Sequence, residues 1–212
     1  MKKRYRILLI AVFVVFLLLV RFVGEIGLDI APHDRFRIVG VVDGDTVELP
    51  GDRLRLLGID CPEKGQPFYD SAVSYMTALA LGKTAGVAYS EKRRDPYSRM
   101  LGYVFLDDTL FVNAEMVRRG LAYVYLFDDN MADSAMVEAL MAAQIEAIDA
   151  GVGLWSIPHE PEPYYVAGKN SRRFHRPECR SAKKFKPEER IEFETREEAC
   201  RLGYSPCRNC RP

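Results

Sequence analysis

Residues 36–57 read FRIVGVVDGDTVELPGDRLRLL, and this stretch decides the fold. The branched run 36–42 predicts a β-strand. It ends at Asp43-Gly44, a strong signal for a two-residue hairpin turn, and residues 46–49 alternate as a returning strand should. After a second turn, residues 53–57 predict a third strand. Three successive strands joined by tight turns are therefore expected at the start of the main domain.

Shorter patterns continue the domain as far as Trp155, the only tryptophan, which we expect to be a core side chain. Apolar residues at helical spacing, with proline in the first turn, predict a helix over 66–81. Further elements are predicted as follows: strands 84–90 and 100–105, a helix from an N-cap at Asn113 to Arg119, and a helix over 132–150. This order favours an α+β fold, a five-stranded OB-fold barrel with about three helices.

The N-terminal segment has the features of a membrane or export signal. Four cations precede the apolar run Ile7–Val20. The run is shorter than the ~20 residues that comfortably cross a bilayer. It has the length of a signal-peptide core, but no Ala-x-Ala cleavage site follows it. We expect residues 1–30 to be an uncleaved signal-anchor or a cleaved signal peptide. Because positive charges stay cytoplasmic, the rest of the chain would be exported, on the cell membrane or secreted.

Charge separates the C-terminal part from the rest. The whole chain has 30 basic and 30 acidic residues, so its net charge indicates no partner. Residues 164–212, however, hold 13 lysines and arginines against 7 acidic residues. A proline-rich acidic stretch, 157–163, precedes them and predicts a linker. We therefore expect a main domain over 35–156 and a small second module over 164–212, whose basic excess is a mild hint of nucleic-acid contact.

Acidic and arginine residues gather at the predicted strand ends of the main domain. Carboxylates can hold a hard divalent cation, a further carboxylate can accept a proton from water, and guanidiniums can grip phosphate oxygens. Taken singly, each such residue is more often a turn cap or a surface charge. Together they form a set suited to phosphodiester hydrolysis: Asp43, Asp45, Arg55, Asp60, Glu63 and Arg99.

The motifs that contain these residues resemble, in order, those of the staphylococcal nuclease (thermonuclease) family. The matching segments are 41–46 (VVDGDT), 55–63 (RLLGIDCPE), 97–99 (YSR), 112–122 (VNAEMVRRGLA) and 153–155 (GLW). The resemblance covers about 36–156. It implies the OB-fold barrel named above and a calcium-dependent nuclease that acts on DNA or RNA and leaves 3′-phosphate ends.

The resemblance also implies roles for individual residues. Asp45 and Asp60 match the calcium-ligating carboxylates, and the backbone carbonyl of Cys61 matches a further ligand. Asp43 matches an outer-shell acid. Glu63 matches the proposed general base.

The remaining matches concern the substrate. Arg55 and Arg99 match the phosphate-binding arginines. Tyr97 matches a substrate-side position, and Tyr123 and Tyr125 match two more ambiguously, because the chain is compressed after residue 122. Tyrosines can stack on bases, and packing at the barrel edge is an equal alternative for each. The loop after Glu63 is also shorter than in the family.

The C-terminal module contains a candidate metal site. His175-x3-Cys179 and Cys207-x2-Cys210 have the spacing of zinc ligands, and so small a module gains from a bound metal. Residues 174–212 resemble the zinc-binding domain of the Ada DNA-repair protein, although His175 stands where that domain has a cysteine. Two disulfides are the alternative, since an exported protein favours them.

The sequence thus predicts calcium-dependent hydrolysis of DNA or RNA, with a zinc-binding module and a membrane segment attached. The alternative is a non-catalytic membrane protein that binds single-stranded nucleic acid. Such a protein would not need the carboxylates and arginines, and this chain keeps all of them. Nothing in the sequence indicates an oligomeric state.

Overall fold

The computed structural model describes residues 34–212. Residues 32–212 form one compact unit, which is separate from residues 1–31. The predicted signal-anchor over 1–30 lies outside the described residues. Within residues 34–212, no helix combines the length and the apolar character needed to cross a bilayer.

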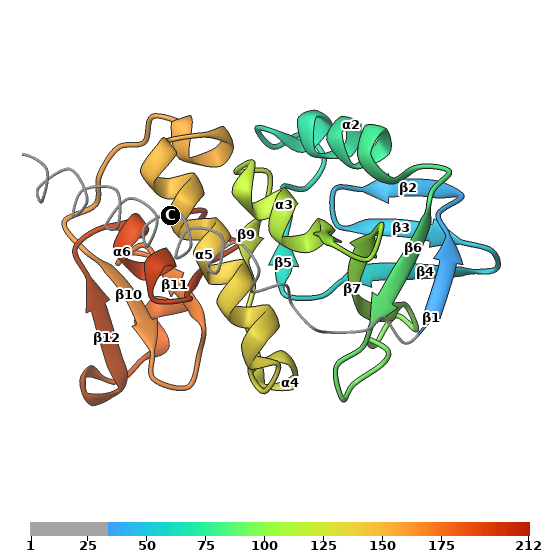
Figure 1. The fold of residues 1–212 in the computed structure, drawn as a ribbon. Helices are drawn as coiled ribbons and strands as arrows, with labels where there is room; N and C mark the ends of the chain where they lie inside the picture. Colours follow the sequence, from blue (N-terminus) through green and yellow to red (C-terminus); the bar gives the residue numbers. More distant parts are fainter. Residues whose placement is uncertain (1–33) are drawn as a thin grey trace, which may run out of the picture. The chain divides into compact units, whose positions relative to one another are not determined.

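A mixed sheet forms the first part of the described chain (Figure 1). Its strands pair in the order β1-β6-β7-β4-β3-β2, and β8 pairs with β7. All neighbours are antiparallel except β4 and β7, which run parallel. The bounds are β1 Asp34–Arg37, β2 Gly40–Asp43, β3 Thr46–Leu49, β4 Asp52–Leu56, β6 Thr84–Ala88, β7 Met100–Leu106 and β8 Leu110–Phe111. A separate ladder joins β5, Ile59–Asp60, to β9, Tyr123–Val124.

The first predicted strand is split, which corrects the expectation for 36–42. β1 pairs with β6, whereas β2 pairs with β3. At the break, Ile38 N donates to Lys83 O and Val39 N donates to Glu48 O. Within residues 34–212 the sheet is therefore open, with β1 and β2 as its edge strands, and it does not form the predicted five-stranded closed barrel. The predicted strand is split because its backbone changes partner between Ile38 and Val39, from the chain before β6 to β3.

Four helices accompany this sheet, where the sequence predicts three, because residues 128–131 form a short helix of their own. The helices are α2 Tyr69–Ala80, α3 Val112–Arg118, α4 Asp128–Met131 and α5 Ser134–Ala150, followed by the 3₁₀ turn η1 Gly153–Ser156. The prediction of Asn113 as an N-cap is wrong. Asn113 lies inside α3 with a fully buried amide that accepts from Val104 N and donates to Leu57 O. A tertiary partner has replaced the local capping role.

The C-terminal residues form a second, four-stranded sheet of order β12-β10-β11-β13. Its strands are β10 Tyr165–Gly168, β11 Arg173–His175, β12 Arg190–Phe193 and β13 Ser205–Pro206, with the helix α6 Arg196–Arg201 and the 3₁₀ turns η2 Ala182–Lys184 and η3 Pro187–Glu189. The domain boundaries expected from the sequence stay a prediction. We call residues 164–212 the C-terminal module below.

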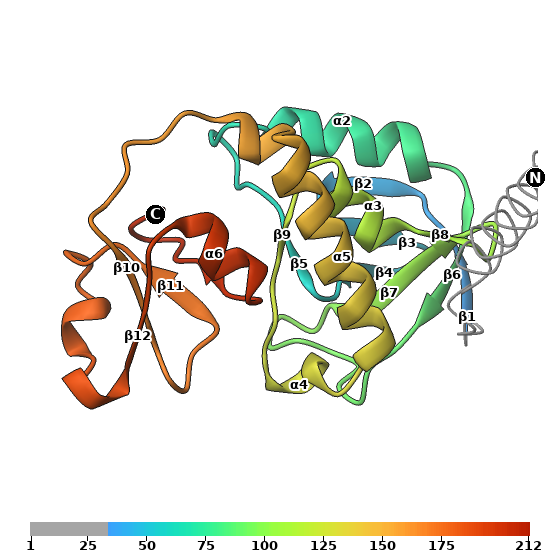
Figure 2. The same ribbon diagram turned by 60° about the vertical axis from the view of Figure 1, so that its left-hand side comes forward.

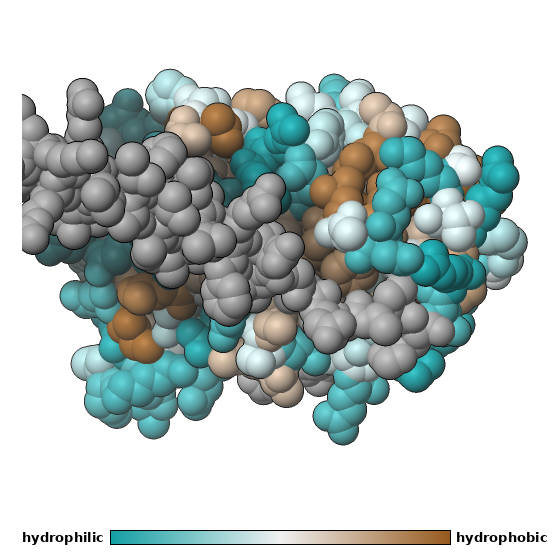
Figure 3. Space-filling view, viewed as in Figure 1, coloured by the Kyte–Doolittle hydropathy of each residue, from teal (hydrophilic) through white to brown (hydrophobic). Residues whose placement is uncertain are grey.

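Helix α5 lies between the module and the nuclease part, with α6 on one side and α3 and β9 on the other (Figure 2). The buried Gln144 side chain accepts from Val124 N and donates to Cys200 O of α6. Trp155 is partly buried and packs edge-on against Tyr123, beside the apolar cluster of the module. Trp155 thus lies where the module meets the rest of the described chain. The sequence had suggested a core side chain, and that expectation is corrected. On the face shown in Figure 3, hydrophobic patches are separated by hydrophilic side chains.

Candidate active site

The β2–β3 hairpin and strand β4 bring the predicted metal ligand Asp45 next to Arg55. Thr46 of β3 pairs with Arg55 of β4, and Leu56 N donates to Asp45 O. This register places the Asp45 carboxylate 3.0 Å from Arg55 Nη2, with both side chains about nine-tenths buried. Asp43 stays at the turn, where its Oδ1 accepts from Asp45 N. The local hairpin therefore presents one buried carboxylate and one partly buried acid behind it.

Arg55 links the hairpin to β5. Its Nη1 donates to Leu56 O and its Nη2 donates to Ile59 O, so the guanidinium is held in one orientation. The same Nη2 lies 3.4 Å from Asp60 Oδ1. Asp45 and Asp60 therefore converge on a single nitrogen atom. Buried carboxylates this close are hard oxygen ligands that fit Ca²⁺.

Asp45 has little access to water and several neighbours. Its Oδ2 accepts from Cys61 N at 2.8 Å, and its Oδ1 accepts from Thr46 Oγ1 at 3.2 Å. Burial raises the pKa of the Asp45 carboxyl to about 7, although the Arg55 guanidinium opposes the shift. A second positive charge beside Asp45 would favour its charged form. Cys61 itself is buried, and it contacts Asp45 through its backbone.

Arg99 approaches the same edge from the turn before β7. Asp95 pairs with its Nε and Nη2 at 2.7 Å. Its Nη1 lies 3.5 Å from Thr46 Oγ1, beside Asp45 in the chain. Tyr97 is 81% exposed, and the Arg99 guanidinium lies 5.5 Å from its ring centre. The structure therefore brings Arg99 and Tyr97 to the edge where Asp45 lies.

Glu63 is accessible, as a base that activates water must be. It follows β5, and its side chain is 59% exposed. Its backbone N–H donates to the Gln66 side chain, which fixes the short loop before α2. Glu63 and Asp60 both line a cavity of about 290 Å³. Tyr123 lines the same cavity, although burial raises its pKa and its ring packs on Trp155. The substrate-side role of Tyr123 stays a prediction.

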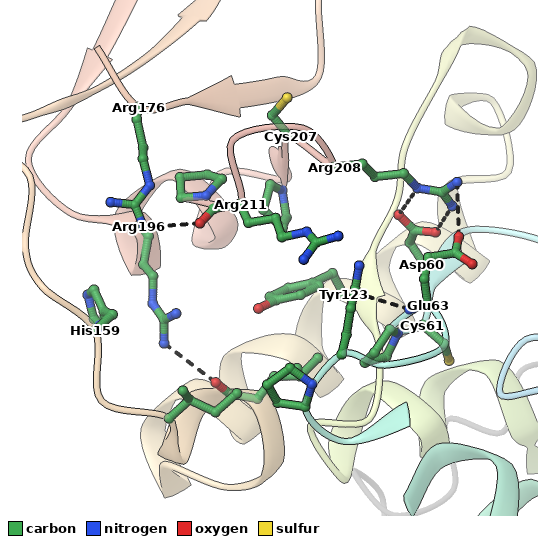
Figure 4. Close-up of a pocket in the computed structure, with 17 residues that line it drawn as sticks. Asp60, Cys61, Glu63, Tyr123, His159, Arg176, Arg196, Cys207, Arg208 and Arg211 are labelled. Carbon is green, nitrogen blue, oxygen red and sulfur yellow. Dashed lines mark hydrogen bonds and ion pairs between the residues drawn. The ribbon is translucent and has the colours of Figure 1, made fainter. Parts of the chain in front are cut away.

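Two arginines that the sequence analysis did not single out also reach this site. Arg208 of the C-terminal module binds Asp60 with its Nε, at 3.1 Å from Oδ2, and with its Nη2 on Oδ1. Its Nη1 lies 3.3 Å from Glu63 Oε1. Figure 4 shows the Arg208 guanidinium over both carboxylates. Arg173 Nη2 lies 3.8 Å from Asp60 Oδ2. The one sequence signal for them is the basic excess of the module.

The four predicted zinc ligands come together. Their ligand atoms all lie within 4.8 Å of one another: His175, Cys179, Cys207 and Cys210. Ligands of a tetrahedral zinc with sulfur at about 2.3 Å are about 4 Å apart, so the cluster fits that ion. Burial, with the Arg173 charge, lowers the pKa of His175, which favours the neutral ring that binds metals. Cys200 is buried within α6 and takes no part in the cluster.

Comparison with known proteins assigns the family. The family model "Staphylococcal nuclease homologue" matches residues 53–157. An uncharacterized endonuclease of Escherichia coli O157:H7 is 40% identical over an aligned length of 134 residues, and the alignment covers 61% of this chain and 82% of that protein. The chain belongs to the staphylococcal nuclease family.

Other members of the staphylococcal nuclease family give the same result. A micrococcal nuclease of Shigella flexneri is 32% identical over 142 residues, 61% of this chain and 78% of its own length. A thermonuclease of Staphylococcus hyicus is 27% identical over 172 residues, 74% of this chain and 99% of its own. The chain is therefore an enzyme, a nuclease. The family match ends at residue 157, so it does not include the Cys/His cluster.

Proposed function

We propose that the chain hydrolyses phosphodiester bonds in DNA or RNA with the help of calcium and leaves 3′-phosphate ends. The observation that carries this proposal is the convergence of Asp45 and Asp60 on one nitrogen of Arg55, at 3.0 and 3.4 Å. Asp45, Asp60 and the Cys61 carbonyl would hold the ion, with Asp43 behind them. A bound calcium ion would polarise the phosphoryl oxygen.

The chain's own side chains would carry the remaining chemistry. Glu63 is exposed beside Asp60 and would accept a proton from the attacking water. The guanidiniums of Arg55 and Arg99 would donate to the phosphate oxygens as charge develops in the transition state. Arg55 is held by two backbone carbonyls and Arg99 by Asp95, so both are oriented before substrate binds. Tyr97 and Tyr125 would contact the bases.

The test of the proposed hydrolysis uses single-stranded DNA and RNA, calcium and a chelator. We expect cleavage with calcium and no cleavage with chelator. A 3′-phosphatase should release one terminal phosphate from each product. Glu63→Gln should lower kcat by about 10²- to 10⁴-fold, because a general base is lost. Glu91→Gln removes an exposed carboxylate elsewhere and is the control. Full activity of Glu63→Gln would exclude the assigned base, and binding without cleavage by the wild type would support the non-catalytic alternative.

We further propose that His175, Cys179, Cys207 and Cys210 bind a structural zinc ion. The closed set of four ligands supports this, since catalytic zinc sites keep an open position. In residues 34–212 all five cysteines are free thiols. Metal analysis of the purified protein tests the proposal, with one zinc per chain as the expected result.

The location of the protein is also a proposal. The cations and apolar run at the N-terminus support a signal-anchor that leaves the nuclease part exported. Fractionation of cells would place the chain in the detergent-extractable membrane fraction. Recovery of a shortened chain from the medium would instead indicate a cleaved signal.

A further inference from the structure

A second cavity, of about 410 Å³, is lined by residues of the nuclease part and of the C-terminal module. It lies beside Asp45 and Asp60, because their partner Arg55 is among its lining residues. Its charged lining is one-sided. The nuclease side contributes Arg55, Lys92 and Arg99, and the C-terminal module contributes Arg173 and Arg208, against one carboxylate, Asp95. A cavity of this kind fits a polyanion.

Aromatic rings complete the chemistry of this cavity. Tyr97 and Tyr125 both line it. Tyrosine rings beside a cationic groove stack on the bases of single-stranded nucleic acid, whereas paired bases offer no free face. The lining therefore fits an unpaired strand, with phosphates on the guanidiniums and a base on the exposed ring of Tyr97.

Arg173 is held in place as a phosphate-binding group would be. Its Nη1 donates to Pro206 O at 2.9 Å, and its guanidinium stacks on Tyr125, 4.4 Å from the ring centre. Its Nη2 points to Asp60. A guanidinium that is already oriented loses little freedom when it binds an anion.

Arg208 lies in the sequence between Cys207 and Cys210, two of the four predicted zinc ligands. The conformation of that loop therefore sets the position of Arg208. Both Asp60 oxygens accept from its guanidinium. A divalent cation bound by Asp60 would therefore have to displace Arg208 from at least one oxygen. Because the Arg208 side chain is 50% exposed, it has room to turn towards a phosphate.

We propose that Arg173 and Arg208 bind the backbone phosphates of a single-stranded substrate, opposite Arg55 and Arg99. The C-terminal module is then one wall of the substrate site of this nuclease. The inference rests on the proposed function for the identity of the strand, but its binding part is testable without cleavage. The opposite role, in which Arg208 blocks the site, predicts opposite changes in affinity.

The experiment measures binding of a fluorescent single-stranded oligonucleotide to the full-length protein, with Glu63→Gln in every variant to prevent cleavage. Affinity is recorded against salt concentration, in calcium and in chelator. Each lost phosphate contact should weaken binding several-fold and reduce the slope of log affinity against log salt by about 0.7. We expect this for Arg173→Ala in both buffers, and for Arg208→Ala mainly in calcium.

Three controls separate the inference from loss of folding and from loss of charge. Arg180→Ala removes an exposed arginine of the same module that does not line this cavity, and it should leave the slope unchanged. Arg173→Lys and Arg208→Lys keep the charge and should restore the slope. Zinc content and melting temperature of each variant report whether the module is intact.

An unchanged slope in both alanine variants would overturn the inference, and tighter binding by Arg208→Ala would assign it the blocking role. Failure of the inference is distinguishable from failure of the proposed function. A wild type that cleaves while the slopes do not change keeps the hydrolysis and removes the phosphate contacts. If the variants show the expected slopes but the wild type never cleaves, the phosphate contacts are kept and the proposed hydrolysis is excluded.

Discussion

Asp60 lies within ion-pair distance of three arginine side chains. Arg55 reaches it from β4, and Arg173 and Arg208 reach it from the C-terminal module. Its neighbour Asp45 forms an ion pair with Arg55, and burial raises the pKa of the Asp45 carboxyl. The two predicted metal ligands therefore differ in their partners: Asp60 contacts three arginines and lines a cavity, whereas Asp45 contacts Arg55.

The raised pKa of Asp45 predicts how calcium binding depends on pH. The carboxyl is charged above about pH 7 and neutral below it. Since a metal ligand must be charged, the calcium dissociation constant should rise as the pH falls, by up to about tenfold per pH unit below that value. Calorimetric titration with calcium at several pH values measures this. A dissociation constant that stays flat down to about pH 5, well above the usual carboxyl pKa, would contradict the assignment.

At the level of elements, the packing of α2 on the β2–β3 turn positions the acids. Gly44 lies in that turn, and a β-carbon there would be 2.7 Å from Ala72 Cβ of α2 and 2.8 Å from Cys61 Sγ. Such distances are too short for carbon or sulfur atoms. The glycine thus lets the turn, the helix and the loop after β5 approach closely, and this approach brings Cys61 N to Asp45.

Gly44→Ala should therefore destabilise the protein by about 1–3 kcal/mol, because the added methyl group has no free space. It should also weaken calcium binding, since the turn that presents Asp45 must shift. Urea unfolding and calcium titration measure the two effects. Gly51→Asn is the control, because Gly51 has φ +81° and a β-carbon added there would meet no atom within 4 Å, and asparagine tolerates that conformation. Equal stability of the two variants would contradict the packing argument.

At the scale of the whole molecule, a module outside the family match contacts the candidate nuclease site through Arg173 and Arg208. The module is attached through Gln144, which binds Val124 and Cys200 at once, and through Arg196, which donates to Leu154 O. Its Cys/His cluster shapes the loop that carries Arg208. Metal binding in the module and substrate binding at the nuclease site should therefore be coupled.

Loss of the proposed zinc ion should raise KM more than it lowers kcat, because Arg173 and Arg208 would lose their positions while Arg55, Arg99 and Glu63 keep theirs. Cys207→Ser tests this, with zinc content and steady-state kinetics as the measurements. Cys200→Ala removes a buried thiol outside the cluster and should keep the zinc. If Cys207→Ser lost zinc with KM unchanged, the module would have no part in substrate binding.

The sequence by itself determined the family and the order of the acidic and arginine motifs. These motifs are local: Asp43 and Asp45 share one hairpin, and Arg55, Asp60 and Glu63 follow within a few residues. Turn chemistry and strand pairing are sufficient to bring such neighbours together. Strands β3, β4, β6 and β7 and helices α2, α3 and α5 were predicted within a few residues for the same reason, since hydrophobic periodicity records which face is buried. The short strands β5, β8 and β9 and the strands of the C-terminal module were not predicted.

Only the tertiary structure decided the contacts between distant segments. Periodicity could not show that the first strand divides between two edges, or that Asn113 bonds across to Leu57 instead of capping its helix. Nor could it place Arg208 on Asp60, 148 positions earlier in the chain. A single arginine near the C-terminus carries no local signal for its partner, because that pairing follows from how α5 packs between α6 of the C-terminal module and α3 and β9 of the nuclease part.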